Sequence, residues 1–201
     1  MEPAVDTKID GRRARGERAR AAVLDAILDL LQEGDLKPTA ERVADRAGVS
    51  LRLVFHHFSD LESLYGAAAD RQSERLRPLV KRIPSEGAFE DRLEAFLRQR
   101  VRLWEKITPV RRASLLLEPF SKAIGVRLQD ARRIAREEAA AVFRPEIENF
   151  LRTDRADVVA AVDAASAWQT WEVLRRHQKL PIESARRVIA RTLSALLAQG
   201  K

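Results

Sequence analysis

The chain has 201 residues, no cysteine, 33% charged residues and a formal net charge of +7 at pH 7. The lack of thiols excludes disulfide bonds and thiolate metal sites, and the amino-terminal segment MEPAVDTKIDGRR has no apolar run of the kind found in secretory signals. No stretch approaches the roughly 18 consecutive apolar residues of a membrane-spanning helix. We therefore expect a cytoplasmic protein that does not associate with membranes.

The positive net charge does not by itself locate a partner. Residues 1–58 carry ten basic and ten acidic side chains, so the whole excess of positive charge lies after residue 58. A local cluster, RRARGERAR at residues 12–20, holds five arginines against one glutamate. Such a segment before a first helix can lie along DNA phosphates or remain a solvated tail. Both alternatives stay open for residues 1–15, which we predict to form a disordered basic arm.

The first helix is predicted over residues 17–32. Apolar residues recur there at steps of three and four, which is the stripe of an amphipathic helix. Gly34 follows the stripe and is a typical helix terminator. The stripe consists of Ala19, Val23, Ala26, Ile27, Leu30 and Leu31.

Residues 39–58, TAERVADRAGVSLRLVFHHF, read as two short helices joined by a tight turn. Thr39 and Ser50 are N-cap candidates, because a hydroxyl oxygen can accept a hydrogen bond from a free N–H of the first turn. Gly48 stands where a chain leaving a helix often needs positive φ. This pattern predicts a helix-turn-helix, whose second helix enters the major groove of DNA. An ordinary pair of bundle helices, with Gly48 as a simple C-cap, is the alternative.

The remainder of the chain also reads as helical. Ser59 and Glu62 fit a capping box for a helix over 60–81, in which Pro78 is expected to distort the last turns. Thr108-Pro109 is expected to begin a helix that Gly125 ends, and Pro145 to kink the helix after it. No hairpin signal or internal repeat is present. We predict an all-α fold of about nine helices, the others covering residues 89–106, 126–151, 154–178 and 181–199.

The segment from Ala19 to Leu64 resembles the DNA-binding head of the tetracycline-repressor (TetR) family of bacterial transcription regulators. The likeness is carried by AGVSLRLVFHHFSDLESL, which is similar to the family's Gly-Val-Ser, Thr-Leu-Tyr, His-Phe and Lys-Glu pattern. A weaker likeness joins residues 168–176 and LPIESARRVIARTLSALL to the family's last two helices. The resemblance implies a helix-turn-helix head at residues 16–60 and a ligand-binding and dimerisation body at residues 61–201.

The chain departs from the family pattern at four positions of the head. The usual Thr falls at Leu53, the usual Tyr at Phe55 and the usual Lys at Leu61, whereas Arg52 replaces a common Gly. In the family that Tyr hydroxyl and that Lys often contact phosphates. Affinity for DNA must therefore depend on other residues of this chain.

The predicted DNA-contacting residues lie on both sides of the turn. Arg52 is the first candidate for base reading, because an arginine can bond guanine O6 and N7 together, and His56 is the second. Phe55 and His57 are expected near the DNA backbone, although Phe55 could pack on a sugar or a thymine methyl. Alternatively, His56 and His57 could form a partly buried pair whose hydrogen bonds are satisfied. Lys37, Thr39 and Ser50 suit phosphate contacts, which set register. The full set is Lys37, Thr39, Ser50, Leu51, Arg52, Phe55, His56 and His57.

By the same resemblance, a ligand pocket lies among the middle helices and a dimer interface at the last two. Plain hydrophobic core is the alternative for each pocket candidate, and Arg100, Arg102 and Glu105 are candidate polar groups at the pocket edge. The helices over 154–178 and 181–199 would form a four-helix bundle with a second copy. The pocket candidates are Phe89, Phe96, Trp104, Leu116, Phe120, Phe143 and Trp168.

Together these observations predict a homodimeric transcription regulator, in the first instance a repressor. It would bind a near-palindromic double-stranded DNA operator and respond to an unidentified small-molecule effector; two recognition helices about 34–36 Å apart would match successive major grooves. A helical scaffold protein that has lost DNA binding is the alternative. An enzyme is disfavoured, because no Gly-rich phosphate loop or Ser/His/Asp set is readable, and neither a cofactor nor a metal site is predicted.

Overall fold

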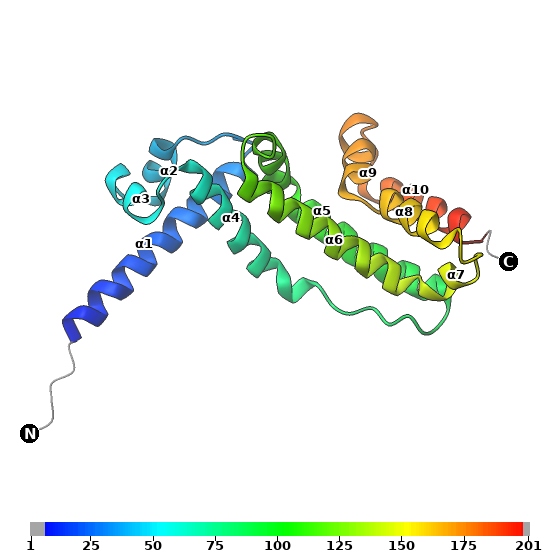
Figure 1. Cartoon of the computed structure of the whole chain (residues 1–201). Helices are drawn as coiled ribbons and strands as arrows, with labels where there is room; N and C mark the ends of the chain where they lie inside the picture. The colour runs from blue at the N-terminus through cyan, green and yellow to red at the C-terminus, as the bar shows by residue number, and fades with distance from the viewer. Residues whose placement is uncertain (1–6, 199–201) are drawn as a thin grey trace, which may run out of the picture. The chain divides into compact units, whose positions relative to one another are not determined.

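The computed structural model describes residues 7–198, and every regular element in that range is a helix (Figure 1). This confirms the predicted all-α fold. The chain separates into two compact units: unit 1 is Met1–Arg75 with Ile107–Gly125, and unit 2 is Leu76–Lys106 with Val126–Lys201. Residues 1–6 of the predicted arm and residue 199 of the predicted last helix lie outside the described range. None of the described helices is both long and apolar enough to cross a membrane.

Unit 1 is built on a long first helix that begins earlier than predicted. Its elements are α1 (Thr7–Gln32), α2 (Ala40–Ala47), α3 (Leu51–His57) and α4 (Leu61–Leu76), with the end of α5 (Phe89–Leu117) and the beginning of α6 (Lys122–Val142). Residues 7–15, predicted as part of a disordered arm, are therefore helical. The strong helix formers Arg13, Ala14 and Arg15 favour this extension, against a cost of about 1 kcal/mol at Gly11.

The core of unit 1 lies under the apolar stripe of α1. Figure 1 shows α2 and α3 beside α1, and contacts between these helices confirm the arrangement. The stripe residues Val23 and Ile27 are fully buried, as are Val43 of α2 and Val54 of α3. The predicted amphipathic stripe is confirmed, and it fixes the short helices α2 and α3 on one rigid support.

Helix α4 is capped one residue later than predicted. Asp60 Oδ1 accepts a hydrogen bond from the Ser63 N–H at 2.7 Å, and Ser63 Oγ accepts one from the Asp60 N–H at 3.3 Å. The bond from Ser63 lowers the pKa of Asp60. The predicted capping box of Ser59 with Glu62 is wrong, because the Glu62 carboxylate instead accepts the Ser121 hydroxyl. A carboxylate is an equally good cap, so Asp60 takes the role.

An ion pair joins α1 to α4. Asp25 Oδ1 lies 2.6 Å from Arg71 Nε, Asp25 Oδ2 lies 3.1 Å from Arg71 Nη2, and Arg75 also binds the Asp25 carboxylate. The hydrogen bond from Arg71 is the main reason why the pKa of Asp25 lies below its ordinary value of 3.8. This ion pair of Asp25 with Arg71 and Arg75, called the clamp below, therefore forms only while Asp25 is ionised.

We expect Asp25→Asn to lower the free energy of unfolding at pH 7 by about 1 kcal/mol, a modest loss because the pair is partly exposed to water. The lowered pKa means that this stabilisation is present above pH 3.8 and disappears as the pH falls through the lower folded value. Urea unfolding at pH 7 and at pH 3 measures the difference, which should shrink at pH 3. Asp130→Asn, at an exposed pair on α6, is the control, and equal stability of the Asp25 variant and wild type at pH 7 would contradict the clamp.

Unit 2 combines a helix pair with a carboxy-terminal bundle. Segments of α5 and α6 run antiparallel and are joined by Gln99 to Glu138 at 2.6 Å and by Arg100 to the Ala135 carbonyl at 2.6 Å (Figure 1). The other elements are η1 (Arg77–Leu79), α7 (Arg144–Glu148), α8 (Arg155–Ala165), α9 (Trp168–Glu172), the π-helical turn η2 (Val173–His177) and α10 (Ile182–Leu197). As predicted, Pro78 distorts the end of the preceding helix, because α4 stops at Leu76 and η1 is a 3-10 turn.

Prolines and glycines explain three differences between the predicted and observed helices. Helix α5 continues through Pro109, where a break was predicted; a proline removes one helical hydrogen bond, and the buried Val110 keeps the next turn packed. Gly125 lies within α6 instead of ending a helix. At Pro145 the predicted kink is a full break, because the proline lies in the first turn of α7, where its missing N–H costs little.

The helix predicted over 154–178 is divided into α8, α9 and η2. The Ser166 hydroxyl donates to the Val162 carbonyl at 2.7 Å, and the Thr170 hydroxyl donates to the Ala164 carbonyl at 2.6 Å. Hydroxyls that bond nearby carbonyls compete with the helical ladder. The helix therefore breaks at Ser166 and Ala167, a feature that apolar spacing alone did not indicate.

Candidate nucleic-acid interface

The turn between α2 and α3 has the geometry that the sequence predicted. Gly48 adopts φ 65° and ψ 34°, and its N–H bonds back toward the end of α2. Thr39 caps α2 by accepting the Arg42 N–H at 3.4 Å, and Ser50 caps α3 by accepting the Leu53 N–H at 3.2 Å. The αL conformation is one that glycine adopts without a steric penalty. These observations confirm the predicted helix-turn-helix.

Helix α3 buries one side and exposes the other. Val54 and the adjoining Phe58 are buried, whereas Arg52, Phe55 and His56 are exposed. Residues three and four apart share a helix face, so Arg52 lies on one surface with Phe55 and His56. Of the remaining predicted residues of this helix, Leu51 and His57 are half-buried. The structure thus brings three of the predicted DNA-contacting residues together on the outer face of α3.

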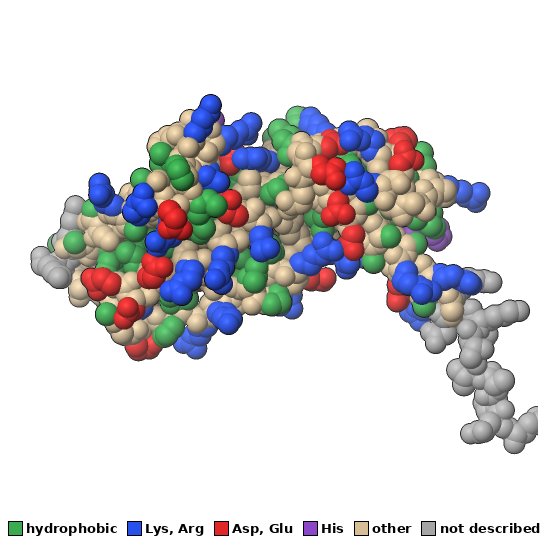
Figure 2. All heavy atoms as spheres, turned by 180° about the vertical axis from the view of Figure 1, so that it is seen from behind, with side chains coloured by type: hydrophobic (Ala, Val, Ile, Leu, Met, Phe, Trp, Pro, Cys, Tyr) green, Lys and Arg blue, Asp and Glu red, His purple; other side chains and the backbone are tan. Residues whose placement is uncertain are grey.

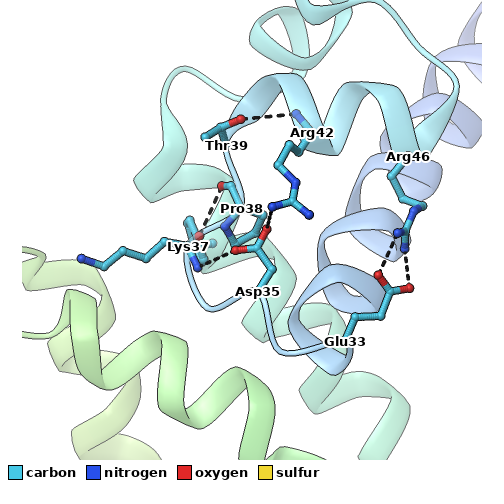
Figure 3. Close-up of polar contacts among 8 residues, drawn as sticks. Glu33, Asp35, Lys37, Pro38, Thr39, Arg42 and Arg46 are labelled. Atoms are coloured by element: carbon cyan, nitrogen blue, oxygen red, sulfur yellow. Dashed lines mark hydrogen bonds and ion pairs between the residues drawn. The ribbon is translucent and has the colours of Figure 1, made fainter.

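The arginines of the head differ in whether a carboxylate already holds them. Arg42 lies 2.8 Å from Asp35, and Arg46 forms two hydrogen bonds with Glu33 at 2.8 and 2.9 Å (Figure 3). Arg46 thereby lowers the pKa of Glu33. Within the described residues, the Arg52 guanidinium forms neither an ion pair nor a hydrogen bond. Arg52 is therefore the cation of α2 and α3 that remains available to a partner.

Lys37 precedes α2 at the exposed edge of the turn. Its backbone N–H donates to Asp35 Oδ1 at 3.2 Å, while its side chain extends away from that carboxylate (Figure 3). The Thr39 and Ser50 oxygens accept backbone N–H groups, and the pKa of Glu41 is lowered by a hydrogen bond from its own backbone N–H and then by one from the Thr39 side chain. Lys37, Thr39 and Ser50 are all exposed. This arrangement suits contacts to phosphate oxygens, which position a protein without reading sequence.

We expect Lys37→Ala to weaken binding to different duplexes by a similar factor. Loss of one phosphate contact should reduce the slope of log K against log salt by about 0.9. Titration of labelled duplexes at several salt concentrations measures both quantities, and Lys122→Ala, at an exposed lysine of α6, is the control. A changed sequence preference with an unchanged salt slope would contradict a phosphate contact.

His57 lies against α1 rather than on the outer face of α3. A Cβ built at Gly16 would be 3.9 Å from His57 Cε1, and the buried Nε2 of His57 has no hydrogen-bond partner. The neighbouring groups are cationic or titratable: the His56 ring at 5.3 Å, and Arg20, which packs 5.3 Å from the Phe58 ring. Burial, followed by the charges of His56 and Arg20, lowers the pKa of His57. A satisfied histidine pair, the alternative drawn from the sequence, is not what the structure contains.

The free energy of unfolding should fall as the pH drops below the ordinary histidine pKa of 6.5. The unfolded chain binds the His57 proton at that pKa, whereas the folded chain binds it only at a lower pH, so acid favours unfolding. We expect His57→Leu to raise the free energy of unfolding by about 1 kcal/mol at pH 8, because an unpaired buried nitrogen is removed. At pH 5.5 the increase should be larger. Thermal melts at both pH values test this, with the exposed His177→Leu as control. If the stability gained by His57→Leu is the same at both pH values, the lowered pKa of His57 does not contribute to the pH dependence of folding.

Charge over the wider surface does not define the interface. Figure 2 shows Lys and Arg side chains spread over one face of the molecule with Asp and Glu among them. This distribution agrees with the sequence count, in which residues 1–58 have no net charge. The local geometry of α3 is consequently more informative than the net charge of +7.

Comparison with known families decides what this head is. Residues 23–68, which span the core of α1 to the middle of α4, match the family described as bacterial regulatory proteins, tetR family. The head of the chain, residues 23–68, is therefore similar to the DNA-binding head of the tetR family. The match is to a family of regulatory proteins, which supports a DNA-binding transcriptional regulator and agrees with the prediction that the chain is not an enzyme.

Solved structures share the fold along most of this chain. A transcriptional regulator from Rhodococcus sp. Rha1 is 20% identical with a TM-score of 0.64, and the match covers 92% of this chain and 96% of that one. A tetR-family transcriptional regulator from Streptomyces coelicolor is 19% identical with a TM-score of 0.66, covering 92% and 82%. At such identities the likeness concerns the fold alone. A comparison with curated proteins yields no match.

The seven pocket candidates are divided between the two units of the chain. In unit 2, Phe96 packs edge-on against Phe143 at 5.1 Å, and Phe89 lies 6.0 Å from Phe143. Trp104 stacks on Trp171, with 5.1 Å between the ring centroids. Trp168, three residues before Trp171, is also buried. In unit 1, Leu116 is exposed and Phe120 is 86% exposed. The assignment of a pocket to this set stays a prediction, and five of its members lie in packed aromatic core or at its edge.

Three polar groups predicted at the pocket edge have different environments. Arg100 is buried, lies 4.8 Å above the Phe96 ring and 3.2 Å from Glu138, and has an unpaired Nε. Burial is the main cause that lowers the pKa of Arg100. Glu105 accepts the Trp171 indole N–H at 3.0 Å. Arg102 is exposed and lines a cavity. Trp171, the partner of Trp104 and Glu105, was not among the predicted pocket residues, although its spacing of three from Trp168 places it on the same helix face.

Proposed function

We propose that this tetR-family regulator binds a near-palindromic operator as a homodimer in the cytoplasm and acts as a repressor. Helix α3 would lie in the major groove, with Arg52 bonding a guanine and His56 and Phe55 contacting adjacent bases or sugars. Lys37, Thr39 and Ser50 would contact phosphates. The observation that carries the proposal is the outer face of α3, where an exposed arginine has no internal carboxylate partner.

Support for a dimer comes from the outward side of α10. Helices α8 and α10 lie side by side in unit 2 (Figure 1), and α10 buries Ile189 and Leu193. On its other side Val188, Thr192 and Ala195 are exposed and follow at steps of four and three. The Thr192 hydroxyl is satisfied by the Val188 carbonyl at 3.0 Å. This small, uncharged surface would allow close approach of a second copy across a two-fold axis.

Control by a small-molecule ligand would use the chain connection between the units. Helix α4 follows α3 after only three residues and continues directly into η1 of unit 2. A ligand that prefers the conformation of the body in which the two heads are wrongly spaced would release the operator. The proposal thus requires differential affinity of the ligand for two states.

Selection of random duplexes with the purified full-length protein, at two salt concentrations, tests this function. We expect a near-palindrome with half-sites about one DNA turn apart and binding that weakens as salt is raised. If no sequence is enriched and no duplex is retained at low salt, the apolar Phe55 and Leu61 on the head would favour a helical scaffold that does not bind DNA.

A further inference from the structure

A cavity in unit 2 lies between the chain segment 78–84 and one face of α5. Its volume is about 490 Å³, which falls within the range of about 300–1,000 Å³ typical of small-molecule sites. The Gln99 side chain fixes its wall by accepting the Lys81 N–H at 2.8 Å and by donating to Glu138 at 2.6 Å. Pro78, Leu79, Ile83 and Ala95 provide apolar lining.

The charged lining of this cavity is entirely basic. Its ionisable side chains are Lys81, Arg82, Arg98 and Arg102, and no Asp or Glu lines it. Arg98 and Arg102 are four residues apart on α5, so two like charges share one face, which is unfavourable without a counter-charge. Arg98 lies at 3.9 Å from Glu94, a carboxylate that Arg186 also binds. Among the described residues, Arg82 and Arg102 have no salt bridge.

We propose that this cavity binds an amphipathic carboxylate, with the carboxylate between Arg98 and Arg102 and an apolar chain along Ile83, Leu79 and Pro78. A guanidinium can hold a carboxylate through two parallel hydrogen bonds, and the apolar wall buries the remainder of the molecule. An uncharged ligand of the same shape would lack these charge-assisted hydrogen bonds, and a cationic one would add to the repulsion. The observed lining therefore selects for negative charge as well as for apolar surface.

The inference concerns binding to unit 2, and only its regulatory consequence depends on the proposed function. The segment 78–84 follows α4 of the head directly in the chain. A ligand that holds this segment against α5 would favour one conformation of that connection. The site is separate from the aromatic residues predicted to line a pocket, because none of the seven borders this cavity.

Calorimetric titration of the full-length protein with decanoate and with 1-decanol, both below their aggregation limits, tests the site. We expect decanoate to bind at least about tenfold more tightly than decanol, because charge-assisted hydrogen bonds are lost with the neutral probe. Arg98→Ala/Arg102→Ala should weaken decanoate binding by about tenfold or more and leave decanol binding unchanged. The matched control is Arg133→Ala/Arg136→Ala, which removes two exposed arginines of α6 and should change neither titration.

A second variant tests the cavity without changing its charge, and a folding control accompanies both variants. Ala95→Phe would fill the cavity and should weaken both probes, while thermal melting checks that each variant is folded. Equal affinity for decanoate and decanol, or wild-type decanoate binding by the double variant, would overturn the inference. Operator binding is measured separately, so a chain that binds decanoate but no duplex would refute the proposed function and leave this site intact.

Discussion

Replacing Arg52 with alanine is expected to weaken binding to the selected operator by roughly 5- to 150-fold, which corresponds to about 1–3 kcal/mol. The side chain lies on the outer face of α3, and no carboxylate of the described residues holds it. Removing the Arg52 side chain should therefore change the free energy of unfolding little and lower the affinity for the operator strongly. Discrimination at one base pair of each half-site should also relax, because a bidentate contact to guanine would be lost.

Fluorescence anisotropy with a labelled operator and with single-base variants measures these effects. Arg133→Ala removes an exposed arginine whose partners are Asp130 and Glu137, so it matches the charge change away from the head and should leave affinity unchanged. Wild-type affinity of the Arg52 variant would remove the central contact from the proposed interface, even if the protein proved to bind DNA.

Ala195→Glu is expected to convert the proposed dimer to monomers and to reduce operator affinity by about 100-fold or more. A two-fold interface repeats every substitution, so two negative charges would face each other or be buried without partners, which typically costs several kcal/mol. A monomer would engage one half-site at a time and lose the advantage of linked binding.

Sedimentation measurements across a range of concentrations give the oligomeric state, and operator titrations give the affinity. Gln129→Glu adds the same charge at an exposed position of α6 and is the control. A dimer that persists with glutamate at Ala195 would place the interface elsewhere than on the exposed side of α10.

Local signals in the sequence were sufficient to predict the helix-turn-helix. Thr39, Gly48 and Ser50 act through their own backbone or through residues three positions away, so their roles are determined by short-range chemistry. The stripe of α1 was equally readable, because one periodic pattern extends over several turns. The head therefore follows from features that need no knowledge of distant contacts.

Other parts of the structure depend on contacts that short-range signals do not specify. Helix α5 continues through Pro109 because the flanking turns are packed, whereas the helix predicted over 154–178 breaks where Ser166 and Thr170 bond carbonyls. Asp60 replaced Ser59 as a cap because Glu62 has a partner at Ser121. The His57 side chain lies near Gly16 of α1, a neighbour that spacing within α3 could not reveal. The basic cavity required residues from two segments to be brought together.

The most direct measurement of the central account is a binding cycle that joins Arg52 to one guanine atom. Each guanine of the selected half-site is replaced in turn by 7-deazaguanine, which lacks the N7 acceptor, and affinity is measured for wild type and for Arg52→Ala. If Arg52 reads a guanine in the major groove, one replacement should weaken wild type by about tenfold and leave the variant unaffected. If every replacement weakens both proteins equally, Arg52 does not contact guanine N7, and α3 does not read the operator in the way proposed.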